Sequence, residues 1–135
     1  MKNGYIYVDS NIFPTLLAIS EDEQSKGLMY EPYPPPIMSF VYAEPRIVKF
    51  WMKNTPSPLD IVFCCNGNIK QICTGEPLST KTIGDDYLSD LIIEFPFGTV
   101  KNSQIKIGHK VGIIAPTESE LKKIIAEKTS KFVKF

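Results

Sequence analysis

Residues 59–74 read LDIVFCCNGNIKQICT, which is two apolar runs on either side of the dipeptide Asn66-Gly67. Asparagine and glycine both accept the positive φ angles that a two-residue hairpin turn requires, so this dipeptide is a strong hairpin signal. The stretch therefore predicts two antiparallel strands, residues 59–65 and 69–74, in a fold built mainly from β-strands.

Further strand-like segments lie on both sides of this hairpin, each short, apolar and bounded by proline, glycine or polar turn residues. They are residues 5–8, 15–19, 37–42, 47–51, 91–95, 104–107 and 111–114. Between them, residues 43–46 predict a turn, the proline-rich residues 31–36 an extended connector, and residues 79–90 a long loop. We expect a mainly β (α+β) fold, a small rolled sheet or β-barrel of about eight short strands.

Capping boxes predict two helices. Ser20 and Glu23 begin the first, which should end at Gly27, a residue suited to the end of a helix. Thr117 and Glu120 begin the second, over about residues 118–129. The apolar face of this second helix holds Leu121, Ile124 and Ile125. We expect that face to pack on the chain's own strands, which predicts a monomer.

The overall composition is that of an ordinary globular protein. The chain has 135 residues, of which 43% are hydrophobic and 22% charged, and its formal net charge is zero. This length predicts a single domain, residues 1–135. The charge balance gives no support for a nucleic-acid or membrane partner, and no segment approaches the roughly 18 apolar residues that span a bilayer. Because the first residues lack the apolar core of a signal peptide, we expect a cytoplasmic protein.

The sequence offers few groups for metal or cofactor chemistry. Cys64, Cys65 and Cys73 have no CxxC spacing, and His109 is the single histidine, so no metal site is predicted. A disulfide between Cys65 and Cys73 is compatible with the hairpin, but we do not expect one in a reducing compartment. No glycine-rich phosphate or dinucleotide motif occurs, so we expect no cofactor.

Residues 50–61, FWMKNTPSPLDI, place a dense polar cluster between two strand-like segments. Loops carried by rigid strands are where binding groups tend to lie. The candidate ligand-binding residues are Trp51, Lys53, Asn54, Thr55, Asp60 and Glu76. The same residues also have structural interpretations: the tryptophan can be a core or rim aromatic, and the polar side chains can bond nearby backbone groups in a turn. The sequence leaves both interpretations open.

Several motifs match one known family in order along the chain. They are Glu23 with Gly27-Leu28-Met29, Met38-Ser39-Phe40, Phe50-Trp51-Met52-Lys53-Asn54-Thr55, Pro58-Leu59-Asp60-Ile61 with Phe63, Asn66-Gly67-Asn68-Ile69, Glu94 with Pro96 and Gly98, and Ile107-Gly108. On these motifs the chain resembles the domain-of-unknown-function 192 family over about residues 5–114, and residues 117–135 extend beyond the usual family end. The resemblance implies a compact β-rich fold and a site near the Trp-Met-Lys-Asn-Thr signature, and it implies no particular activity.

Three functional hypotheses follow. The first, which we favour, is a non-catalytic binding module for a small polar ligand, a sugar or a peptide, with an apolar floor and a few convergent polar groups. The second is a hydrolase-like enzyme that uses Asp60 or Glu76 as general base and Lys53 to stabilise charge. The third is a subunit of a larger assembly that docks through the C-terminal helix.

Overall fold

The computed structural model describes residues 1–114 and residue 119, and within them it contains seven strands and two short helices. Their order is β1 (Lys2–Val8), β2 (Asn11–Ala18), α1 (Glu21–Lys26), β3 (Met38–Ile47), β4 (Leu59–Cys65), β5 (Asn68–Gly75), β6 (Leu88–Pro96), α2 (Thr99–Asn102) and β7 (Val111–Ile114). The prediction of a mainly β, rolled-sheet fold is confirmed. None of the helices in this part of the chain has the length and apolarity needed to cross a membrane.

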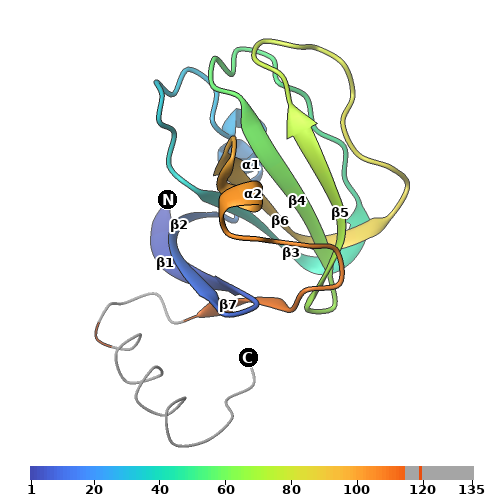
Figure 1. Ribbon diagram of the computed structural model, residues 1–135. Helices are drawn as coiled ribbons and strands as arrows, with labels where there is room; N and C mark the ends of the chain where they lie inside the picture. The colour runs from blue at the N-terminus through green and yellow to red at the C-terminus, as the bar shows by residue number, and fades with distance from the viewer. Residues whose placement is uncertain (115–118, 120–135) are drawn as a thin grey trace, which may run out of the picture.

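All seven strands form one curled sheet, in the order β5-β4-β6-β3-β2-β1-β7 (Figure 1). Neighbouring strands are antiparallel except β2 and β3, which are parallel and are joined through α1 and the proline-rich connector. The two edges of the sheet approach each other at a bridge between Asn68 and Lys110. Ile69 strengthens this junction, because its N–H donates to the His109 carbonyl at 3.0 Å and its carbonyl accepts from Gly108 at 2.9 Å. The sheet is therefore rolled nearly into a barrel.

The hairpin predicted from Asn66-Gly67 joins β4 to β5. Asn66 and Gly67 have φ angles of 51° and 78°, the positive values that a tight turn between twisted strands requires. Cys65 and Asn68 pair directly across the turn, and the register shifts once between Phe63 and Cys64.

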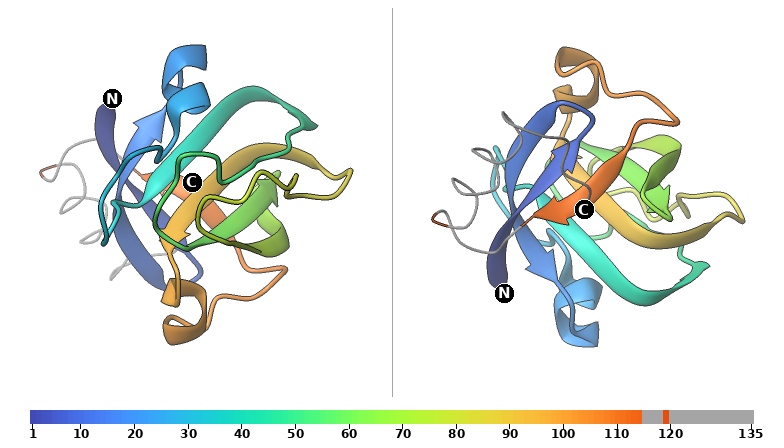
Figure 2. Two further views of the ribbon diagram at one scale, coloured as in Figure 1. Left: turned by 90° about the horizontal axis from the view of Figure 1, so that it is seen from above. Right: turned by 90° about the horizontal axis from the view of Figure 1, so that it is seen from below.

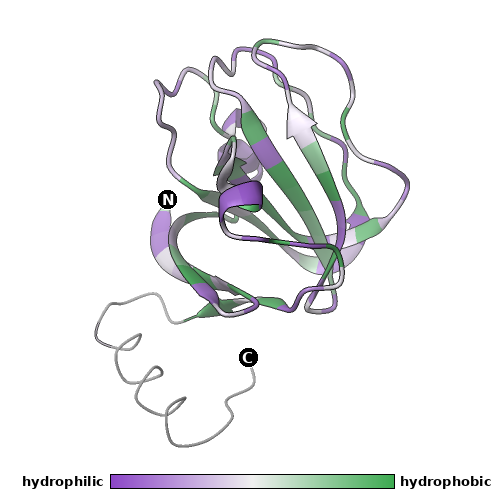
Figure 3. Ribbon diagram, viewed as in Figure 1, coloured by the Kyte–Doolittle hydropathy of each residue, from purple (hydrophilic) through white to green (hydrophobic). Residues whose placement is uncertain are grey.

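The sheet buries apolar side chains on both faces, because successive residues of a strand point to opposite sides. On β4, Leu59, Ile61 and Phe63 face one cluster, whereas Val62 and Cys64 face the other. Figure 3 shows the hydrophobic residues concentrated along these central strands, whereas α2 is mainly hydrophilic. Two cores on two faces of one sheet also mean two separate surfaces on which a site can be built.

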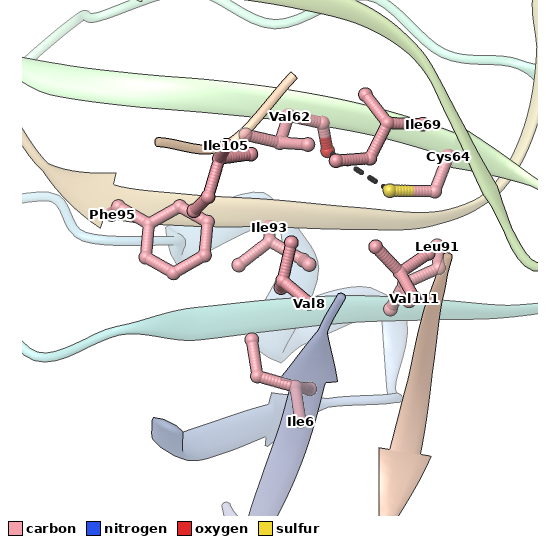
Figure 4. Packing of buried hydrophobic residues seen from close by; sticks show 10 residues of the cluster. All are labelled: Ile6, Val8, Val62, Cys64, Ile69, Leu91, Ile93, Phe95, Ile105 and Val111. Atoms are coloured by element: carbon pink, nitrogen blue, oxygen red, sulfur yellow. Dashed lines mark hydrogen bonds between the residues drawn. The ribbon is translucent and has the colours of Figure 1, made fainter. Parts of the chain in front are cut away.

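Figure 4 shows the cluster inside the curl. Its buried members are Ile6, Val8, Val62, Cys64, Ile69, Leu91, Ile93, Phe95, Ile105 and Val111. The Cys64 thiol donates to the Val62 carbonyl at 3.8 Å, and burial raises the pKa of this thiol above its ordinary value. A buried, protonated thiol is a poor nucleophile, so Cys64 acts here as a small apolar side chain.

The first helix forms as its sequence predicts. The Ser20 hydroxyl accepts from the Glu23 N–H at 3.2 Å, and Glu23 Oε1 accepts from the Ser20 N–H at 3.0 Å. The Ile19 N–H also donates to Glu23 Oε1, at 3.1 Å. The backbone hydrogen bonds from Ser20 and Ile19 to this carboxylate lower the pKa of Glu23 to about 2. α1 then ends at Gly27, whose φ of 51° is unfavourable for other residues.

Several boundaries differ from the prediction. Residues 43–46 are not a turn but part of β3, where pairing with β6 breaks after Val41 and resumes at Arg46. Residues 47–51 do not form a separate strand: Ile47 is the last residue of β3, and Phe50 makes an isolated bridge to Ile83. Proline and polar residues mimic a turn locally, but the distant partner β6 keeps the chain extended.

The segment before β7 also differs from the prediction. Residues 104–107 are a turn and not a strand, and α2, from Thr99 to Asn102, precedes them. A helix was also expected at residues 118–129, as the docking element of the assembly hypothesis. These residues lie outside the described part of the chain, apart from residue 119.

Gly75 packs against a buried methionine and offers a test of this packing. A Cβ at position 75 would lie 2.5 Å from the Met52 sulfur, and Met52 is fully buried. We expect Gly75→Ala to lower the free energy of unfolding by about 1–3 kcal/mol, the usual cost of overpacking a core. Urea denaturation measures this, and the cost should shrink in a Met52→Ala background. An equal cost in both backgrounds would contradict the proposed clash.

Candidate functional site

A cavity of about 460 Å³ lies between α1, the middle of β3 and the segment that follows β3. Its walls are formed by residues of α1 and of the turn after it, by Phe40, Tyr42 and Arg46 of β3, and by residues 47–51. Thr55 and Glu94 complete the lining. Residues of α1 line the cavity. Figure 2 shows α1 and α2 on opposite sides of the curled sheet.

Glu94 is the most unusual residue of this cavity. It lies in the middle of β6, is only 5% exposed, and its Oε1 is buried with no hydrogen-bond partner among the described residues. Burial raises the pKa of Glu94 to about 8, so the side chain is mostly protonated near neutral pH. An unpaired buried polar atom costs free energy in the absence of a partner, and such atoms mark sites where a ligand can supply one.

Gly27 leaves the space beside Glu94 open. A Cβ at position 27 would lie 3.7 Å from Glu94 Oε1 and 3.5 Å from the ring of Phe40. A Cβ there would occupy part of this space at ordinary contact distance. The glycine that ends α1 therefore leaves room beside the carboxyl group.

Aromatic rings form the apolar part of the cavity. The rings of Phe40 and Phe50 lie 4.9 Å apart between centroids, and Phe50 in turn lies 5.9 Å from Phe63 of the core. Trp51 is 48% exposed and lines the same cavity. Half-exposed aromatic faces next to buried ones are well suited to hold the apolar face of a ligand.

Charged and polar groups surround the aromatic rings. The Arg46 guanidinium lies 4.2 Å from the centroid of the Tyr42 ring, a cation–π arrangement. Burial raises the pKa of Tyr42, an effect that Arg46 opposes and Glu94 reinforces. The phenol, the guanidinium and the carboxyl group are thus electrostatically coupled within one cavity.

Of the candidate residues from the sequence, Trp51 and Thr55 line this cavity. Thr55 is buried, and its hydroxyl donates to the Lys53 carbonyl at 3.3 Å, which fixes the local turn. Its backbone also contacts the loop after β5, since the Leu78 N–H donates to the Thr55 carbonyl at 2.9 Å. Thr55 therefore has both a structural role and a position in the site.

Lys53 and Asn54 form the outer part of the signature turn and do not line the cavity. The Lys53 ammonium lies 5.2 Å from the centroid of the Trp51 ring, and Asn54 adopts a φ of 56°. The Asn54 carbonyl accepts from the Tyr30 N–H at 2.7 Å. Asparagine tolerates the left-handed conformation better than most residues, so the backbone angle at position 54 explains the presence of Asn54 without a ligand.

Asp60 faces the opposite side of the sheet. It is 6% exposed, and its Oδ2 accepts from the backbone N–H groups of Gly98 and Val100, each at 3.0 Å. On β4 it alternates with Leu59 and Ile61, which face the cluster beside Glu94. Asp60 therefore holds the loop that begins α2 and is not brought together with Trp51 and Thr55.

Glu76 is exposed directly after β5 and does not line the cavity. Its carbonyl accepts from Ser79 at 3.3 Å within a local turn. The six candidate residues thus divide among a cavity, a turn beside it, the opposite face of the sheet and an exposed loop.

The comparisons with known proteins agree with this architecture. The family model of domain of unknown function 192 (DUF192), described as an uncharacterized ACR, matches residues 7–113. The chain belongs to the DUF192 family. None of the curated proteins compared with the chain matches it.

Two crystal structures with this fold come from bacteria. One is a putative transcription regulator from Sinorhizobium meliloti, with 28% sequence identity and a TM-score of 0.76, over 82% of this chain and 93% of that chain. The other is a protein of unknown function from Novosphingobium aromaticivorans, with 27% identity and a TM-score of 0.76, over 82% of this chain and 84% of that chain. Chains that are 27–28% identical to this one therefore share its fold.

Glu94, Tyr42 and Arg46 are not among the site residues that the sequence predicts, although Glu94 belongs to one of the DUF192 motifs. One signal was available: Glu94 interrupts the apolar run of residues 91–95. A carboxyl group in the middle of a buried strand is rarely placed there for packing. Tyr42 and Arg46 gave no such signal, because Tyr42 ended a predicted strand and Arg46 lay in a predicted turn.

Proposed function

We propose that this DUF192 chain is a non-catalytic binding module and that it takes a small polar ligand in the cavity beside Glu94. The observation that carries the proposal is the buried carboxyl group, whose Oε1 has no partner among the described residues. A protonated carboxyl group can donate one hydrogen bond and accept another, as a hydroxyl or amide group on a ligand requires. The aromatic rings beside it supply the apolar contact.

Binding is favoured over hydrolysis because general acid–base chemistry usually needs two positioned groups. In the cavity the other carboxyl group is that of Glu21, which is exposed on α1. Of the two candidate bases in the hydrolase hypothesis, Asp60 already accepts two backbone hydrogen bonds on the other face of the sheet, and Glu76 is exposed outside the cavity. Geometry therefore supports a ligand that is held and not transformed.

Trp51 provides a direct test, because it is the single tryptophan of the chain and lines the cavity. We expect a panel of monosaccharides, N-acetylated amines and dipeptides to contain members that change Trp51 fluorescence saturably. Glu94→Met removes both hydrogen-bonding oxygens at similar length and should abolish that response. Glu94→Gln keeps one acceptor and adds donors, so it should weaken binding less.

The control variant is Lys101→Ala, which removes a side chain from a separate cavity beside α2. Its affinities for the panel, measured by Trp51 fluorescence, should equal those of the wild type. Circular dichroism should show that all variants are folded. Saturable binding that survives Glu94→Met, or a panel without any saturable response, would reject the proposed site.

A further inference from the structure

The charges around the cavity are not balanced. Its rim carries Lys26, Arg46 and Lys49 against one carboxylate, Glu21. Lys49 is paired with Asp86 at 3.0 Å, outside the cavity. Arg46 stacks on Tyr42 and has no carboxylate within ion-pair distance in the part of the chain that the structure describes. Its positive charge therefore remains available to an anion.

The inner part of the cavity has a different character. Glu94 is buried and mostly uncharged near neutral pH, and the aromatic rings of Phe40, Phe50 and Trp51 line the same cavity. A ligand cation at this point would have to pass the positive rim and displace the proton of Glu94. A ligand hydroxyl group meets neither obstacle, because it can accept from the protonated carboxyl group and donate to its other oxygen.

The positive rim and the uncharged inner part of the cavity together favour a ligand that carries both a negative charge and a hydroxyl group. On the basis of the proposed function, we infer that the cavity takes a small hydroxylated carboxylate, of the size and chemistry of a uronic acid. A hydroxyl group of the ligand meets Glu94, its carboxylate meets Arg46, and the apolar face of its ring lies on Trp51. Arginine suits this role because its planar guanidinium can bind a carboxylate through two parallel hydrogen bonds.

The test uses sugars that share one ring and differ in charge. Glucuronate, glucose and glucosamine carry negative, zero and positive charge near neutral pH, and galacturonate, galactose and galactosamine repeat the series with another stereochemistry. At pH 6.5 and low salt, titrations followed by Trp51 fluorescence should rank the anion first and the cation last in at least one series. The anion should bind about fivefold tighter than the neutral sugar, as expected for one partly exposed ion pair.

Arg46→Gln should remove that preference, so that the uronate and the neutral sugar bind this variant with similar affinities. Lys101→Gln, a matched loss of one positive charge beside α2, should retain it. Raising the pH from 6 to 9 should weaken binding of the uronate, because Glu94 becomes negative as the pH passes about 8 and then repels the ligand carboxylate. Tyr42, Arg46, Lys26, Lys49 and Glu21 are the other charged or titratable groups that line the cavity.

The outcomes separate this inference from the proposed function. If neutral members of the wider panel bind with dependence on Glu94 but neither series prefers the anion, the uronate class is overturned and the binding module stands. A preference for the anion that survives Arg46→Gln overturns the assignment of Arg46. If no sugar of either series and no member of the panel binds, both proposals fall.

Discussion

Replacing Asp60 by alanine is expected to lower the free energy of unfolding by about 3 kcal/mol or more. Two partly buried backbone N–H groups, those of Gly98 and Val100, would lose their acceptor, and an N–H group left unpaired costs about 1–3 kcal/mol. The loop would also lose the side chain that holds it against β4. Urea denaturation of the wild type and the variant measures the difference.

Asp60→Asn is the matched control, because its amide oxygen can still accept both hydrogen bonds. It should cost distinctly less than Asp60→Ala. Ligand binding beside Glu94 should be retained in both variants at temperatures where they are folded, since Asp60 lies on the other face of the sheet. An alanine variant as stable as the wild type would remove the structural explanation and restore Asp60 as a candidate base.

Local patterns in the sequence predicted the elements that are determined locally. The Asn66-Gly67 turn and the Ser20–Glu23 capping box each involve residues no more than a few positions apart, and both form as expected. Turn and cap chemistry depends on short-range hydrogen bonds, so it can be read without knowledge of the rest of the fold.

The elements that the sequence did not predict depend on partners far along the chain. α2 begins where Asp60, 38 residues before Gly98, accepts its backbone N–H. Residues 43–46 stay extended because β3 and β6 pair again at Arg46 and Ser89. Neither pairing leaves a periodic signal near the residues concerned, so the sequence predicted a turn at residues 43–46 and no helix at residues 99–102.

The candidate site shows the same contrast between features set by the local sequence and features set by distant parts of the chain. The tryptophan of the signature was placed in the candidate site from its sequence context, and it lines the cavity. Asp60 is only nine residues from it, but the alternation of β4 sends its side chain to the other face. Glu94 reaches the cavity from β6, which lies between β3 and β4 in the sheet, and that order cannot be read from local pattern.

The stability of the protein should depend on pH through Glu94. Its pKa is about 8 in the folded chain against an ordinary value of 4.5, because burial disfavours the charged form. Between these values the folded state keeps a proton that the unfolded state has released. Stability is therefore highest below about pH 4.5 as far as this group is concerned, and it falls as the pH rises toward 8.

Glu94→Gln should remove this pH dependence, because an amide does not ionise. The shift from 4.5 to about 8 corresponds to a loss of about 5 kcal/mol in the wild type, at about 1.4 kcal/mol per pH unit. The variant should match the wild type near pH 4.5 and exceed its free energy of unfolding by several kcal/mol at pH 8–9. Urea denaturation at each pH measures the difference between the two proteins, so that the effects of other titrating groups cancel.

Glu76→Gln is the control, because it removes an exposed carboxylate, and its free energy of unfolding should depend on pH as that of the wild type does. If the curves of the wild type and Glu94→Gln instead run parallel from pH 5 to pH 9, Glu94 is not buried as a neutral acid. The uncharged floor that the cavity needs for a hydroxyl group would then be absent.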